Sequence, residues 1–173
     1  MSTLRTTIAR IADWRAIAVL FVSFLVCTSA FTWRQQQLGH ENKVLDVRFW
    51  YTPADVQQLM QNLEAEGRKL YAITQVTLDL AFPLVYGTIF AVLIFRLYGR
   101  DSSRILLWLP MLAVVADLLE NVTTAYLALR FADTESSLAW FSVSCTVTKD
   151  AFLGLSLIVV LIGGIRGSGH DPR

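Results

Sequence analysis

Residues 16–33 read AIAVLFVSFLVCTSAFTW, a stretch of 18 residues without a charge that decides the fold class. Trp14 and Trp33 border this stretch, and the 19 steps between them cover about 28 Å at ~1.5 Å per residue of α-helix. That length matches the roughly 30 Å hydrocarbon core of a bilayer, with an indole at each interface. A cleaved signal peptide is the alternative, because basic residues precede the stretch. We expect a retained membrane span, because the apolar run continues past its small residues to Trp33.

The composition of the whole chain also indicates a membrane protein. Of its 173 residues, 54% are hydrophobic and 17% are charged, against roughly 45–50% and about 25% in an average soluble protein. The mean hydropathy is +0.49. The net charge of +1 provides no basic field for nucleic acid. We therefore expect an integral membrane protein whose partner is the lipid bilayer, with no nucleic-acid partner.

Three further apolar stretches follow the first one. The four predicted spans cover about residues 15–33, 72–96, 105–130 and 138–164. Backbone groups cannot stay unpaired in lipid, so stretches of this length and hydrophobicity form helices. The sequence predicts an all-α fold, a four-helix transmembrane bundle that makes residues 1–173 a single integral membrane domain.

The first loop contains an additional predicted helix, at about residues 53–68. Thr52 is a candidate N-cap, Pro53 occupies the first helical position, and Asp55 completes the spacing of a capping box. Its apolar residues recur at helical spacing and form one stripe, made of Val56, Leu59, Met60, Leu63 and Leu70. We expect an amphipathic helix that packs across the ends of the bundle. The aromatic residues 49–51 just before it are expected to anchor at the membrane interface.

The basic residues of the loops predict the orientation. Arginines gather in the N-terminal segment and in the second loop, LYGRDSSR at 97–104, whereas the third loop offers one balanced arginine. The positive-inside rule then places both termini and the second loop in the cytoplasm. The first loop would be extracytoplasmic, and the protein would reside in the inner or plasma membrane.

Five ionisable residues lie inside the predicted spans. Span two contains Asp79, span three contains Asp117 and Glu120, and span four contains Lys149 and Asp150. A single charge at the bilayer centre costs roughly 2.5–3.5 kcal/mol on insertion scales. Most of these groups must therefore face one another or water.

Helical spacing brings these residues into polar stripes. The stripes are Gln75, Asp79 and Tyr86 on span two; Asp117, Glu120, Asn121 and Thr124 on span three; and Ser142, Thr146 and Lys149 on span four. Three stripes on three helices predict one polar interior. We expect it to open outward beneath the loop helix, with Arg68 and Tyr71 at its mouth. The predicted ligand-binding residues are Asp79, Asp117, Glu120, Asn121, Lys149, Arg68 and Tyr71.

The balance of charge in this interior is acidic. Four carboxylates accompany one lysine, so either a carboxyl group is protonated or a cation occupies the site. Oxygen ligands for a metal ion could come from Asp79, Asp117 and Glu120. The two histidines, His40 and His170, lie outside the spans, which excludes a histidine-rich zinc or haem site in the bundle. No cofactor is expected.

Pro83 adds a backbone feature to span two. Its ring nitrogen carries no hydrogen, so it cannot donate to the carbonyl group four residues earlier, which belongs to Asp79. Span two would therefore present a free carbonyl beside a carboxylate.

Three functions from different classes stay open. The first is a membrane module that binds a proton, a cation or a small polar ligand, within a transporter or alone. The second is an enzyme that modifies a lipid, with Glu120 or Asp117 as general base and Lys149 stabilising an anion. The third is a scaffold or assembly protein whose polar core only fixes helix packing, with Lys149 and Asp117 or Glu120 as a structural ion pair between helices. Whether copies associate into a homo-oligomer is also open.

Four segments carry a resemblance to known proteins: LDVRFWYTPADV at 45–56, EGRKLYAITQVTLDLAFPLVYG at 66–87, ADLLEN at 116–121 and TVTKDAF at 146–152. With these segments the chain resembles small four-span bacterial integral membrane proteins of unassigned function. The resemblance covers most of residues 45–152. It implies the four-span topology and singles out Arg68, Tyr71, Asp79, Asp117, Glu120, Asn121 and Lys149, but it implies no activity.

Overall fold

The computed structural model describes residues 14–39, 44–45, 48, 50–131 and 136–168. Within these ranges the secondary structure is helical, without strands. Four helical stretches are long and apolar enough to cross a membrane: Arg15–Leu38, Glu64–Gly99, Arg104–Leu129 and Ser137–Arg166. The prediction of an all-helical chain with four candidate membrane spans is confirmed, and it indicates an integral membrane protein.

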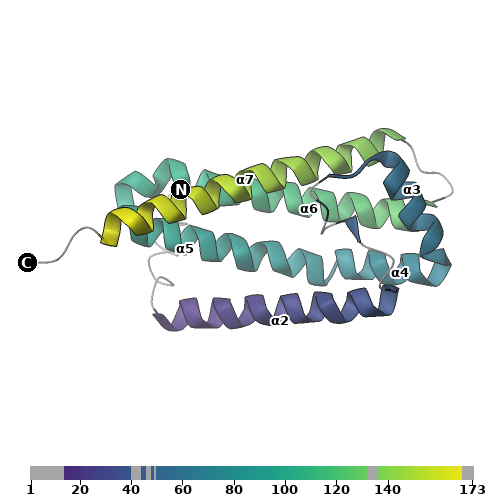
Figure 1. Cartoon of the computed structure of the whole chain (residues 1–173), viewed down its shortest axis with the longest axis horizontal. Helices are drawn as coiled ribbons and strands as arrows, with labels where there is room; N and C mark the ends of the chain where they lie inside the picture. The colour runs from purple at the N-terminus through teal and green to yellow at the C-terminus, as the bar shows by residue number, and fades with distance from the viewer. Residues whose placement is uncertain (1–13, 40–43, 46–47, 49, 132–135, 169–173) are drawn as a thin grey trace, which may run out of the picture.

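The helices follow one another in the order α2 (Trp14–Leu38), α3 (Pro53–Asn62), α4 (Glu64–Gln75), α5 (Leu78–Leu106), α6 (Trp108–Leu129) and α7 (Ser136–Ser168). Figure 1 shows α2, α5, α6 and α7 running along the long axis of the molecule, with α3 and α4 gathered at one end. The first turn of α2 and the last turn of α7 lie at the opposite end.

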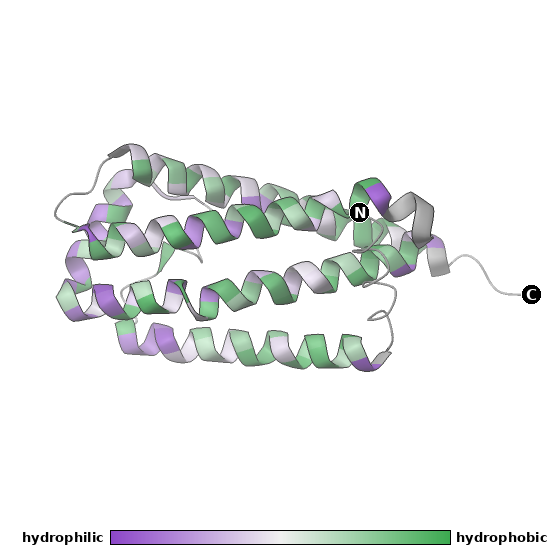
Figure 2. Ribbon diagram, turned by 180° about the vertical axis from the view of Figure 1, so that it is seen from behind, coloured by the Kyte–Doolittle hydropathy of each residue, from purple (hydrophilic) through white to green (hydrophobic). Residues whose placement is uncertain are grey.

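Large apolar side chains cover the outside of the long helices. Phe21, Val115 and Ile158 each expose more than half of their surface. Figure 2 shows hydrophobic residues along the four long helices and hydrophilic residues concentrated around α3 and α4. A soluble protein rarely exposes so continuous an apolar surface, whereas contact with lipid requires it.

Helix α3 begins at the predicted residues. The Thr52 hydroxyl accepts a hydrogen bond from the Asp55 amide at 3.3 Å, and the Asp55 carboxylate accepts one from the Thr52 amide at 2.7 Å. These two bonds form the capping box and satisfy two amides at the start of the helix.

The loop helix differs from the prediction in its extent. Instead of one helix over about 53–68, α3 ends at Asn62 and α4 starts at Glu64, which has a φ of 51°. Gly67 therefore lies inside α4, where a Cβ atom would stand only 3.2 Å from the Cβ of Leu63. Periodicity does not detect this break, because apolar residues recur at compatible spacing on both sides of it.

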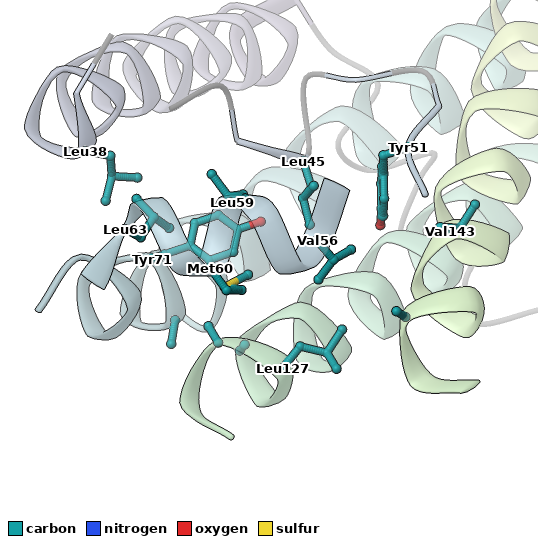
Figure 3. Packing of buried hydrophobic residues seen from close by; sticks show 14 residues of the cluster. Leu38, Leu45, Tyr51, Val56, Leu59, Met60, Leu63, Tyr71, Leu127 and Val143 are labelled. Carbon is teal, nitrogen blue, oxygen red and sulfur yellow. The ribbon is translucent and has the colours of Figure 1, made fainter. Parts of the chain in front are cut away.

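The apolar side of α3 packs over the ends of α6 and α7. Val56, Leu59 and Met60 are buried in one cluster with Leu127 of α6 and Val143 of α7 (Figure 3). Burial of these side chains fixes the α3–α4 segment on one end of the long helices.

Helix α5 contains an interruption near its far end. Gly99 has a φ of 72° and a ψ of −177°, so the range Leu78–Leu106 consists of two helical segments. A positive φ of this kind favours glycine, because a Cβ atom would clash with the backbone. The first segment of α5, up to Gly99, is the part that lies beside α2, α6 and α7.

Candidate functional site

Lys149 joins α7 to α6 in the interior. Its Nζ atom lies 2.8 Å from Glu120 Oε2 and 3.7 Å from Asp117 Oδ1. Glu120 has no exposed surface, and Lys149 and Asp117 are each 7% exposed. Charged groups at this degree of burial require such partners. The predicted stripes of span three and span four thus meet, and three predicted site residues come together.

The second carboxylate oxygen of Glu120 belongs to a hydroxyl cluster. Thr146 Oγ1 lies 2.7 Å from Glu120 Oε1 and 3.0 Å from the hydroxyl of Tyr51. That hydroxyl is also 2.7 Å from Ser142 Oγ and 3.5 Å from Glu120 Oε1. A tyrosine from the segment before α3 therefore reaches the buried carboxylate of α6.

Tyr51 corrects one expectation from the sequence. The aromatic residues 49–51 were expected to anchor at the interface, but Tyr51 is only 1% exposed and points inward (Figure 3). Trp50 is 60% exposed, and Phe49 lies outside the described residues. Tyr51 and Trp50 differ in burial because the tyrosine hydroxyl has polar partners in the interior. The local sequence does not reveal these partners.

Asp79 is held by neighbours on two other helices, α4 and α6. Gln75 Nε2 donates to Asp79 Oδ2 at 3.0 Å, and Thr124 Oγ1 donates to Gln75 Oε1 at 2.8 Å. Asn121 Nδ2 donates to the backbone carbonyl of Asp79 at 2.7 Å. The carbonyl that Pro83 leaves without a partner in the helix is thus bonded by a side chain of α6.

A cavity of about 420 Å³ lies beside these groups. Its walls come from α2, α5, α6 and α7, and its lining residues are Phe24, Thr28, Phe31, Asp79, Phe82, Tyr86, Phe90, Asp117, Lys149, Asp150 and Leu153. The volume falls in the range of about 300–1,000 Å³ that is typical of small-molecule sites. Of the predicted site residues, Asp79, Asp117 and Lys149 line the cavity, whereas Glu120 and Asn121 lie behind its wall.

Aromatic rings form the apolar wall of this cavity. Phe82 of α5 lies 5.4 Å, centroid to centroid, from both Phe24 and Phe31 of α2. It also lies 5.5 Å from the ring of Tyr86, whose hydroxyl donates to Asp117 Oδ2 at 2.8 Å. These phenylalanines were not among the residues predicted for the site. Their helical spacing was the available signal, but phenylalanine in a membrane span is equally common on a lipid-facing surface.

Asp150 lines the cavity as well. It follows Lys149 on α7 and is half-buried. Among the described residues, no hydrogen-bond donor or cation lies within bonding distance of its carboxylate. Of the four carboxylates of the site, Asp150 is therefore the one without a hydrogen bond or ion pair among the described residues.

Arg68 and Tyr71 do not line the cavity. Arg68 Nη1 donates to the carbonyl of Met60 at 2.9 Å, and its guanidinium group lies 4.8 Å from the ring centroid of Phe131. Tyr71 is buried in the apolar cluster between α3, α4 and α6. It is Tyr51, and neither of these two residues, that reaches from the segment before α3 to the buried Glu120. Arg68 and Tyr71 instead join α4 to its neighbours at that end of the molecule.

The acidic residues are not arranged as metal ligands. In the part of the chain that the structure describes, no three His, Cys, Asp or Glu side chains lie together as a metal ion would require. Glu120 turns to Lys149 and Thr146, while Asp79 turns to Gln75. Asp79, Asp117 and Glu120 therefore do not form a shared set of oxygen ligands.

Comparison of the chain with family models, with curated proteins and with solved structures finds no match. The geometry of the cavity and of the ion pairs beside it is therefore what indicates a function.

Proposed function

We propose that the chain is a small integral membrane protein that binds a cation or a proton in a cavity within the bilayer. In this proposal α2, α5, α6 and α7 form a transmembrane four-helix bundle in one domain. The amphipathic helix α3 and the start of α4 cover its extracytoplasmic end, and both termini are cytoplasmic. The arginines of the N-terminal segment and of the second loop support this orientation.

The charge around the cavity carries the proposal. Asp79, Asp117 and Asp150 line it together with one cation, Lys149, which is already paired with Glu120. Four carboxylates thus face one ammonium group in a medium of low dielectric constant. Such an excess is costly unless protons or a bound cation compensate for it.

Asn121 supports the same conclusion. Its Oδ1 atom is buried and accepts no hydrogen bond from the described residues, while its Nδ2 atom is bonded to Asp79. Buried acceptors without a donor are rare in folded proteins. A proton on the carboxyl group of Asp79 or Asp117 would supply such a donor, whereas a ligand in the cavity would not, because Asn121 does not line it.

The other two functions receive less support. A scaffold explains the Glu120–Lys149 pair and the Tyr51 hydroxyl cluster. It does not require a cavity bordered by Asp150, which makes no ion pair or hydrogen bond among the described residues. A lipid-modifying enzyme would need its general base to reach the substrate, and Glu120 does not line the cavity. Asp117 and Lys149 are the residues that such an enzyme would use.

Ligand-dependent stability tests the proposal. The purified chain is unfolded thermally in detergent with Na⁺, K⁺ or tetramethylammonium, and proton release is measured in weak buffer. A ligand at 100 times its Kd should stabilise the native state by about 2.7 kcal/mol. Asp150→Asn should lose the stabilisation and the proton release. The control Glu66→Gln changes an exposed residue of α4 that pairs with Lys69 and should keep both.

Two results would contradict the proposal. The first is a wild-type chain that responds to none of these cations and exchanges no protons with any of them. The second is a response that Asp150→Asn leaves intact. Flux of a bound cation across proteoliposomes would assign the protein to transport, and binding without flux would assign it to a binding role.

A further inference from the structure

The cavity joins an aromatic surface to an anionic one. On the side of α2 and α5, the ring of Phe82 contacts the rings of both Phe24 and Phe31. Asp117 of α6 and Asp150 of α7 lie among the lining residues that face the same space. Tyr86 links the two surfaces, because its ring packs on Phe82 while its hydroxyl donates to Asp117.

This combination discriminates between kinds of cation. A metal ion binds several oxygen ligands at close range, and the described acidic side chains do not converge in that way. Aromatic faces attract cations electrostatically and suit organic ammonium groups, which shed their hydration easily. A space of about 420 Å³ also exceeds what one metal ion fills and suits a small organic molecule.

We propose that the cavity binds an organic ammonium ion that carries an apolar or aromatic body. The charged nitrogen lies against Asp150 and Asp117, and the body lies against Phe24, Phe31 and Phe82. This inference rests on the proposed function and specifies its ligand class. Lys149 pairs with Glu120 at 2.8 Å and with Asp117 at 3.7 Å. Asp150 makes no ion pair or hydrogen bond among the described residues, so its carboxylate is the one left for the ligand.

Binding of benzyltrimethylammonium to the full chain tests this inference. Its matched control is neopentylbenzene, which has the same shape with carbon in place of the charged nitrogen. Titration calorimetry is performed in nanodiscs of phosphatidylglycerol, with empty nanodiscs as the blank for partition into lipid. We expect the cation to bind and the neutral isostere not to bind. Tetramethylammonium, which lacks the aromatic body, should bind at least about tenfold more weakly, the loss of roughly one good aromatic contact.

Two variants separate the charge from the rings. Asp150→Asn should weaken binding of the benzyl cation by about 30-fold or more, as expected for loss of one partner of a desolvated charge pair. Phe82→Leu should weaken it by about 2- to 30-fold, the range of one cation–π contact. Glu66→Gln, on the exposed side of α4, should bind like the wild type. Circular dichroism and gel filtration verify that each variant folds. If Asp150→Asn does not fold, the weaker binding expected for Phe82→Leu still tests the inference.

The outcomes distinguish this inference from the function on which it rests. Equal binding of neopentylbenzene, or unchanged binding in both variants, would overturn the ammonium ligand. If the protein responds to Na⁺, K⁺ or protons but does not bind the benzyl cation, the organic ammonium ligand is also overturned. The proposed function, binding of a cation or a proton, would in that case still hold. If phosphatidylethanolamine in the nanodiscs competes with the probe, the ammonium group comes from a lipid headgroup. If it does not compete, the ligand is a free amine, and both of these results support the inference.

Discussion

The side-chain amide of Asn121 donates to the backbone carbonyl of Asp79 over 2.7 Å. This bond replaces the helical hydrogen bond that Pro83 cannot form, because proline has no amide hydrogen. It ties α6 to α5 beside the cavity, at the residue that also contributes a carboxylate to the lining. The irregularity of α5 is thus part of how the site is held.

Asn121→Leu should destabilise the protein, because the Asp79 carbonyl then stays buried without a donor. For a hydrogen bond between membrane helices we expect a loss of about 0.6–1.7 kcal/mol. Pro83→Ala restores an amide hydrogen at position 83 and should reduce the loss. Unfolding in detergent of both single variants and the double variant measures the coupling. Strict additivity of the two changes would show that Asn121 does not serve this carbonyl.

Lys149→Met should be strongly destabilising, by about 3–5 kcal/mol, because it leaves Glu120 buried without its cation. Glu120→Gln should also be destabilising but by less, because Lys149 keeps Asp117 at 3.7 Å. The double variant Glu120→Gln/Lys149→Met removes both charges. Its loss of unfolding free energy should be smaller than the sum of the losses in the two single variants. Equilibrium unfolding of the four proteins tests this expectation. A double variant that loses the full sum would mean that the two charges act independently.

Tyr51→Phe should loosen α3 without unfolding the long helices. The change removes the hydroxyl that contacts Ser142 and Thr146, a loss of about 1 kcal/mol for a buried hydrogen bond. Hydrogen exchange of the α3 amides should become faster, while exchange in α6 stays near the wild-type rate. Trp50→Phe is the matched control, since Trp50 is exposed. Equal acceleration in both variants would argue against a specific role for the hydroxyl.

The stability of α3 should depend on pH through Asp55. Hydrogen bonds from the side chain and the backbone amide of Thr52 hold the pKa of the Asp55 carboxyl below its ordinary value of 3.8, and Arg48 contributes at 3.6 Å. A lowered pKa means that the folded state binds this proton less readily than the unfolded state. The stabilisation is therefore complete above pH 3.8 and is lost as the pH falls through the lower, folded-state value.

Hydrogen exchange of the first turn of α3, compared between pH 6 and pH 2.5 after correction for the intrinsic rate, measures this dependence. Asp55→Asn should be less stable by about 0.5–2 kcal/mol at pH 6, as for loss of a capping contact, and should lose the dependence on pH. An Asp55→Asn protein with the same pH profile as the wild type would assign the effect to another group.

The residues of the site were only partly predictable. The spacing of Asp117, Glu120 and Lys149 on two helices predicts facing stripes, and the structure brings these side chains together. The same reasoning placed Arg68 and Tyr71 at the mouth of the site, but it could not foresee the break at Glu64 that turns Arg68 toward Met60. Tyr51 was missed because its polar partners lie about ninety positions further along the chain.

By itself, the sequence determined that the chain contains four helices fit to cross a membrane, because long uncharged runs in lipid can satisfy their backbone groups only within a helix. It also determined that the ionisable residues of these helices must find partners, since charge is costly there. Only the tertiary structure decided which partners they find. It places Lys149 against Glu120, lines one cavity with Asp150 and the phenylalanines of α2 and α5, and brings the Tyr51 hydroxyl to Ser142. These pairings depend on how the helices are rotated and shifted against one another. Contacts between residues distant in the sequence fix that arrangement, and local periodicity does not encode it.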